Sequence, residues 1–112
     1  MSVRSESMLW VAQRLSAAVL ALCVVVHLVT IIYAVQGGLS AGEILARTRG
    51  NVGWAAFYAL FVIAVAIHAP IGLRSVLMEW ANWRSRWRDA VLVIFSALLL
   101  MMGMRAVWAV FA

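Results

Sequence analysis

Several residue types that usually supply chemistry are scarce in this sequence. It has no lysine, and its only four acidic residues all lie outside the long apolar stretches. One cysteine, Cys23, excludes an intrachain disulfide, and the absence of a Cys-x-x-Cys-His motif excludes covalent c-type haem attachment. Two histidines and one cysteine offer too few nitrogen and sulfur ligands for a structural zinc site, which takes about four.

Hydrophobic residues make up 67% of the 112 residues, only 12% are charged, and the mean hydropathy is +1.04. This composition is typical of an integral membrane protein. Three apolar runs, at about 15–35, 52–73 and 90–111, can each cross roughly 30 Å of hydrocarbon as a helix. The predicted fold is all-α, with three transmembrane helices in a single membrane-anchor domain, residues 1–112. Because three helices cannot enclose a large cofactor, we expect this domain to form part of a larger helical bundle.

The arginines flank the apolar runs, so the net charge of +5 is interpreted as membrane topology and not as nucleic-acid binding. The first connection holds two arginines, whereas more lie before the first run and around the second connection: Arg4, Arg14, Arg74, Arg84, Arg86 and Arg88. By the positive-inside rule, we expect a multi-pass inner (cytoplasmic) membrane protein with its N-terminus inside. The first run lacks a signal-peptide cleavage site, so we expect it to be retained.

One stripe of the first run carries its small and polar residues, which are Ser16, Cys23, His27, Thr30 and Ala34. Such a stripe is typical of a face directed at another helix or a cofactor. A histidine is costly inside a bilayer, which makes His27 a functional candidate. Residues 1–7 are polar and are expected to fray. Ser40 and Glu43 have the spacing of a capping box, which predicts a short surface helix closed by Gly50.

The second run ends in a group of unusual residues around His68. On a helix, His68, Gly72, Ser75 and Glu79 share one face. Pro70 removes a backbone hydrogen bond near Ala66, and Gly72 removes a side chain, so we expect space beside His68.

In the third run, Ser96 and Gly103 form a stripe suited to close packing. Arg105 is explained equally well by snorkelling to the membrane surface and by contact with a haem propionate.

Two intramembrane histidines favour haem, which is large and apolar and takes axial imidazoles between transmembrane helices. By helical rise, His27 and His68 differ in depth by roughly 12 Å. If both bind iron, we therefore expect two haems at different heights, each completed by a ligand from another chain or a second copy. Alternatively, one histidine is only a hydrogen-bonded packing residue.

Two segments resemble a known family. Gln13-Arg14-Leu15-Ser16-Ala17 resembles the His-Arg-x-Ser-Gly entry to the first helix of the cytochrome b membrane-anchor subunits of succinate dehydrogenases and fumarate reductases. His68-x-x-x-Gly72-x-Arg74, with Glu79 downstream, is similar to their second-helix motif, His-x-x-x-Gly-x-Arg-His followed by Asp. The size and order of the three spans agree. The sequence departs from the family by Gln13 for histidine, Trp10 for serine, Ser75 for histidine and Glu79 for aspartate.

This resemblance implies that His68 is a haem b axial ligand and that Arg14 and Ser16 lie near the quinone. It places Arg74 near a haem propionate or the iron-sulfur partner. Gly72 and Arg105 are further candidates for haem propionate contact or packing. His27 fits the dihaem branch of the family, in which the first helix also supplies a ligand to the haem iron.

The implied function is a haem b-binding anchor that carries electrons between an iron-sulfur subunit and membrane quinone, as a non-catalytic electron-transfer subunit of the enzyme. The dicarboxylate site would lie on a flavoprotein subunit, and the other partners would be a second membrane subunit or second copy and the lipid bilayer. The alternatives are the cytochrome b subunit of a formate or hydrogen dehydrogenase and a haem-free structural anchor. A small efflux transporter would require four spans and an intramembrane carboxylate, and the sequence predicts neither.

Overall fold

The computed structural model describes residues 2–112, and in this range the chain forms four α-helices and no strand. They are α1 (Val3–Gln36), α2 (Ala41–Thr48), α3 (Val52–Glu79) and α4 (Arg86–Phe111). Three of them, α1, α3 and α4, are long and apolar enough to cross a membrane. The predicted all-α class with three membrane spans is therefore confirmed, with each helix extending beyond its apolar run at one end or both.

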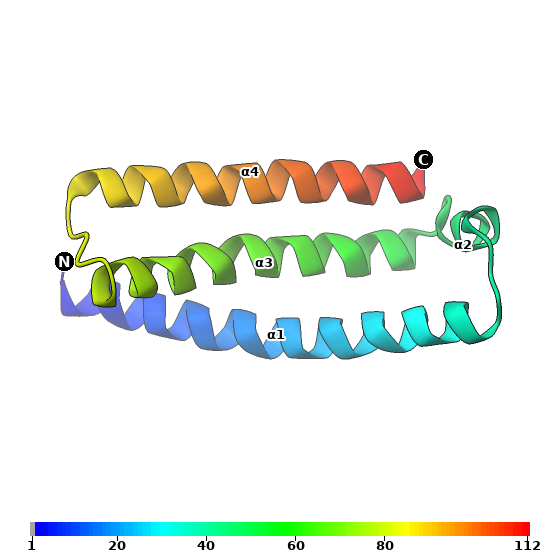
Figure 1. Ribbon diagram of the computed structural model, residues 1–112, viewed down its shortest axis with the longest axis horizontal. Helices are drawn as coiled ribbons and strands as arrows, with labels where there is room; N and C mark the ends of the chain where they lie inside the picture. Colours follow the sequence, from blue (N-terminus) through cyan, green and yellow to red (C-terminus); the bar gives the residue numbers. More distant parts are fainter. Residues whose placement is uncertain (1) are drawn as a thin grey trace.

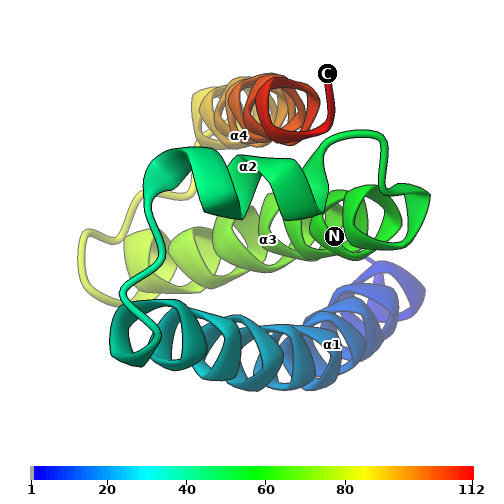
Figure 2. The ribbon, with the colours of Figure 1, turned by 90° about the vertical axis from the view of Figure 1, so that its right-hand side faces the viewer.

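The three long helices lie side by side, and α3 is the central one (Figure 1). Helix α3 packs against α1 on one side and α4 on the other, while α2 crosses the far end of the bundle (Figure 2). The N-terminus and the α3–α4 connection lie together at the opposite end, which we call the N-terminal end. Because α1 and α4 each pack against only one long helix, α3, large apolar side chains such as Leu22 and Val93 remain exposed on their outer faces.

The polar start of the chain is helical, so the predicted fraying of residues 1–7 is wrong for the part the structure describes; residue 1 lies outside it. Ser2 caps α1 by accepting a hydrogen bond from the Ser5 amide (3.2 Å). One turn later, Glu6 forms an ion pair with Arg74 of α3 (3.2 Å). The cap and this tertiary contact order a segment whose composition alone favoured disorder.

The predicted capping box of α2 is confirmed. The Ser40 hydroxyl accepts from the Glu43 amide (3.2 Å), and the Glu43 carboxylate accepts from the Ser40 amide (3.4 Å). After α2, Gly50 adopts φ +66, a conformation that favours glycine, and its amide donates to the Phe111 carbonyl (2.9 Å). The Thr48 hydroxyl donates to the Val110 carbonyl (2.8 Å). Two hydrogen bonds thus attach the first connection to the last turn of α4.

Helix α3 continues through Pro70, which has no amide proton to offer the Ala66 carbonyl four residues earlier. That carbonyl instead accepts a hydrogen bond from the Ser96 hydroxyl of α4 (2.7 Å). In hydrocarbon a backbone carbonyl must be satisfied within the protein, so Ser96 replaces the bond that the proline removes.

Gly103 allows a close approach between α3 and α4. A Cβ atom at Gly103 would lie 2.5 Å from Cγ1 and 3.2 Å from Cβ of Val62. The stripe of Ser96 and Gly103 predicted for close packing therefore does face α3. Arg105, two residues beyond Gly103, is exposed.

We predict that Ser96→Ala lowers the free energy of unfolding by about 1–3 kcal/mol, because it leaves the Ala66 carbonyl without its donor. Thermal unfolding of the protein in detergent measures this. The matched control is Ser75→Ala, since the exposed Ser75 hydroxyl bonds only within its own helix, to Ile71 (3.4 Å). Equal stability of the two variants would contradict the role given to Ser96.

We predict that Gly103→Ala destabilises the bundle by about 1–3 kcal/mol through overpacking against Val62. Adding Val62→Ala removes both methyl groups that clash, so the double variant should recover most of the loss. Unfolding curves of the two single variants and the double variant measure the coupling. Simple addition of the two effects would refute the close contact.

Candidate functional site

His68 meets α1 through a buried serine. Its Nδ1 lies 3.4 Å from the Ser16 hydroxyl, and the same hydroxyl donates to the Gln13 carbonyl (3.1 Å). Ser16 is 6% exposed, whereas His68 is half-buried. Helix α1 thus holds one nitrogen of the ring and leaves the other, Nε2, for a further partner.

His27 is held in the same manner from the opposite helix. Its Nδ1 lies 3.4 Å from the Tyr58 hydroxyl, and its ring makes edge contacts with Tyr58 and Phe61 at centroid distances of 5.7 and 5.8 Å. The Thr30 hydroxyl donates to the His27 carbonyl (2.7 Å). The polar stripe predicted on the first span therefore faces α3, with Cys23 and Ser16 buried along it.

The structure does not bring the two histidines into one site. His27 is level with Tyr58 and His68 with Ser16, which places the two rings about 15 Å apart along the bundle by helical rise. Across residues 2–112 no group of three or more His, Cys, Asp or Glu side chains could hold a metal ion together. The expectation of two different depths is thus supported by the packing, and a single iron bound by both rings is excluded.

Open space lies beside His27. Two clefts of about 530 and 720 Å³ share this residue, together with Tyr58, Ile44 and Thr48. The sequence pointed instead to space beside His68, on the argument that Gly72 removes a side chain. In the structure that position is taken by α1, because a Cβ at Gly72 would lie 3.4 Å from Nε2 of Gln13.

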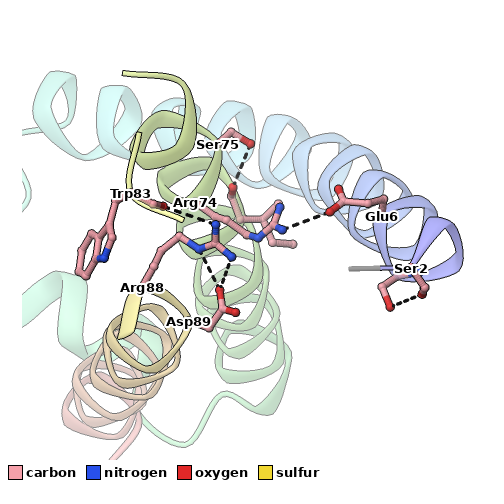
Figure 3. Close-up of polar contacts among 9 residues, drawn as sticks. Ser2, Glu6, Arg74, Ser75, Trp83, Arg88 and Asp89 are labelled. Carbon is pink, nitrogen blue, oxygen red and sulfur yellow. Dashed lines mark hydrogen bonds and ion pairs between the residues drawn. The ribbon is translucent and has the colours of Figure 1, made fainter. Parts of the chain in front are cut away.

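A third cleft, of about 610 Å³, opens at the N-terminal end between α1 and α3. Its lining includes Glu6, Trp10, Gln13, Arg74 and Ser75. Figure 3 shows the ion pair of Arg74 with Glu6 at this end, where the Arg74 side chain is only 13% exposed. The Gln13 side-chain oxygen is buried and has no hydrogen-bond partner in the described part of the chain.

The two residues implied for quinone lie on different faces of α1. Arg14 is exposed, with its guanidinium 5.0 Å from the centre of the Trp10 ring. Ser16 is buried against α3. Residues two apart in a helix do not face each other, so Arg14 and Ser16 do not meet at one site.

Sequence reasoning missed Glu6 and Arg88. Arg88 is 7% exposed; it donates twice to the Asp89 carboxylate (2.9 and 2.8 Å) and once to the Trp83 carbonyl (3.5 Å) (Figure 3). It fixes the α3–α4 connection at the start of α4. Neither residue belongs to a recognisable motif, and both looked like ordinary charges flanking the membrane.

The histidine environments fit haem ligation. An iron-binding imidazole coordinates through one nitrogen while the other usually donates to an oxygen acceptor. Both rings place Nδ1 near a hydroxyl oxygen, at 3.4 Å in each case. Ser16 and Tyr58 would be the outer partners of such ligands, and Nε2 is the nitrogen each ring would offer to iron.

Three membrane-crossing helices, with two hydrogen-bonded histidines at different heights of the α1–α3 interface, define the class as a multi-pass helical membrane protein. The family model of the succinate dehydrogenase/fumarate reductase transmembrane subunit matches residues 1–104, and the chain belongs to this family. Comparison with curated proteins and with solved structures found no match. The chain is accordingly a membrane subunit of a multi-subunit complex of the succinate dehydrogenase/fumarate reductase type.

We predict that Glu6→Gln loosens the first two turns of α1, because it removes the charge that holds them to Arg74. The cost in stability should stay below about 1 kcal/mol, since Glu6 is half-exposed. Hydrogen–deuterium exchange at residues 3–9 should rise, and Glu79→Gln, at an exposed glutamate at the same end, should leave it unchanged. Equal exchange in the two variants would argue against the tether.

Proposed function

We propose that this chain is the haem b-binding membrane anchor of a succinate:quinone or fumarate:quinone oxidoreductase. It would carry electrons between an iron-sulfur subunit and quinone in the membrane. The observation that carries the proposal is His68, half-buried in a membrane span with its Nδ1 against the Ser16 hydroxyl. The family match over residues 1–104 supports the same conclusion.

His68 and His27 would each supply one Nε2 ligand, to two separate irons, because the two rings lie about 15 Å apart along the bundle by helical rise. Haem b supplies reversible one-electron transfer when bound. The protein's part is to hold each ring in place through a hydroxyl on the neighbouring helix. The remaining ligands would come from a second membrane subunit or a second copy of this chain, for which the outer faces of α1 and α4 leave room.

The cleft at the N-terminal end is the proposed quinone site. Arg14 would orient and polarise a quinone carbonyl from its rim, because its guanidinium lies over Trp10 and the Trp10 ring lines the cleft. Arg74 would lie near a haem propionate or the iron-sulfur subunit. Its position beside the cleft supports this role.

We propose that the N-terminal end faces the cytoplasm, since most of the arginines gather there. The iron-sulfur subunit would dock on this end of the anchor. The dicarboxylate reaction would take place on the flavoprotein subunit, with this chain as the non-catalytic membrane partner in the inner (cytoplasmic) membrane.

We predict that the purified complex shows a b-type band in its reduced-minus-oxidised spectrum and that His68→Ala removes one haem. His27→Ala should remove a different haem and leave the His68 signal in place. Haem content per complex, measured as the pyridine haemochrome, distinguishes two haems from one. Full haem content in His68→Ala would refute the ligand assignment, and absence of the band in the unaltered complex would identify a haem-free structural anchor.

A further inference from the structure

We propose that Ser16 is a positioning residue for His68, which it holds with the ring proton on Nδ1, and that Ser16 does not contact quinone. This inference rests on the proposed function, in which His68 binds haem iron. It differs from the role implied by the resemblance, which placed Ser16 beside Arg14 at the quinone.

The location of Ser16 separates it from the quinone cleft. Its side chain lies at the α1–α3 contact and is 6% exposed, and it is absent from the lining of the cleft at the N-terminal end. Gln13, one turn earlier on α1, does line that cleft. Within one turn of α1, therefore, Gln13 lines the cleft and Ser16 contacts the ring of His68.

The hydrogen bonds of Ser16 decide which nitrogen of His68 carries the proton. A serine hydroxyl has one proton to donate and can also accept. The Gln13 carbonyl can only accept, so its 3.1 Å contact with Ser16 requires the serine proton. In the 3.4 Å contact with His68 the serine oxygen must then accept, and the ring must donate from Nδ1. This leaves the lone pair on Nε2, the form of the ring that binds iron.

The second histidine is not restricted in this manner. Within residues 2–112, the Tyr58 hydroxyl has no second acceptor to take its proton, so it can donate to His27 Nδ1 or accept from it. His27 can therefore carry its proton on either nitrogen. The hydrogen bonds of the chain thus fix which ring nitrogen of His68 carries the proton, but not which nitrogen of His27 does.

An Nδ1–H donated to an oxygen makes Nε2 a stronger ligand and keeps the ring plane fixed. Loss of such an outer partner typically weakens metal affinity by about 10- to 100-fold. The Ser16 hydroxyl should therefore stabilise the oxidised iron, which has the greater demand for electron density, and its removal should raise the midpoint potential of that haem.

The test uses the purified complex carrying Ser16→Ala. We expect the midpoint potential of one haem to rise and its retention against an apomyoglobin acceptor to fall by about 10- to 100-fold, while the KM for quinone stays unchanged. Ser16→Thr keeps the hydroxyl and should restore both haem properties. Ser85→Ala is the control, because it removes an exposed hydroxyl of the α3–α4 connection that is hydrogen-bonded to Trp83 and not to the ring.

Three outcomes would overturn the inference. One is a raised quinone KM in Ser16→Ala with unaltered haem potential and retention, which would return Ser16 to the quinone site. Another is an effect of Ser16→Thr equal to that of Ser16→Ala, which would indicate packing and not the hydroxyl. A third is no change in any property. If Ser16→Ala does not assemble, Ser16→Cys keeps the volume with a weak acceptor and should show the same haem changes.

The failure of this inference is distinguishable from failure of the proposed function. If His68→Ala loses its haem while Ser16→Ala behaves like the unaltered protein, the haem ligand stands and only the role of Ser16 falls. If His68→Ala keeps its full haem content, the ligand assignment is refuted, and if the unaltered complex shows no b-type band, the proposed function itself is refuted.

Discussion

The hydrogen bond from the Ser96 hydroxyl to the Ala66 carbonyl is the interaction on which the arrangement of the helices depends. Without it, Pro70 would leave the Ala66 carbonyl unsatisfied in hydrocarbon, where no water can replace the missing donor. The bond also holds α4 against α3 two residues before His68. Pro70 by itself would weaken α3. Because it frees the Ala66 carbonyl to bond with Ser96, it also allows α3 and α4 to be hydrogen-bonded close to His68.

Glycines lie at both helical contacts of α3. Gly103 lets Val62 approach α4, where a Cβ would clash, whereas Gly72 meets Gln13 of α1 at an ordinary contact distance. Because hydrophobic attraction between helices is absent in lipid, such packing and a few hydrogen bonds must hold the bundle together. Both histidines and their hydroxyl partners consequently lie between the chain's own helices, and the outer faces are mostly apolar surfaces for lipid or for partner subunits.

Much of the fold was predictable because each signal was local. Apolar length predicted the three spans, and the Ser40 and Glu43 spacing predicted α2. The start of α1 was not predictable, since its order depends on Glu6 meeting Arg74, sixty-eight residues later in the chain.

The candidate site was likewise predictable only in part. A histidine in a bilayer is conspicuous in a sequence, so His27 and His68 were found. Their hydroxyl partners depend on which turn of α1 lies against which turn of α3, and no motif reports that pairing. The resemblance implied that Ser16 lies near the quinone. In the structure the Ser16 hydroxyl instead contacts the ring of His68.

The attachment of the first connection to the end of α4 has a mechanical consequence. Thr48 holds the Val110 carbonyl, and fourteen residues earlier Ser96 holds the Ala66 carbonyl, which separates the two points by roughly 21 Å along α4. Two hydrogen bonds this far apart prevent α4 from sliding along its own axis. The register of α4 against α3 is therefore fixed, and a partner subunit that binds α4 is held at a fixed height relative to both histidines.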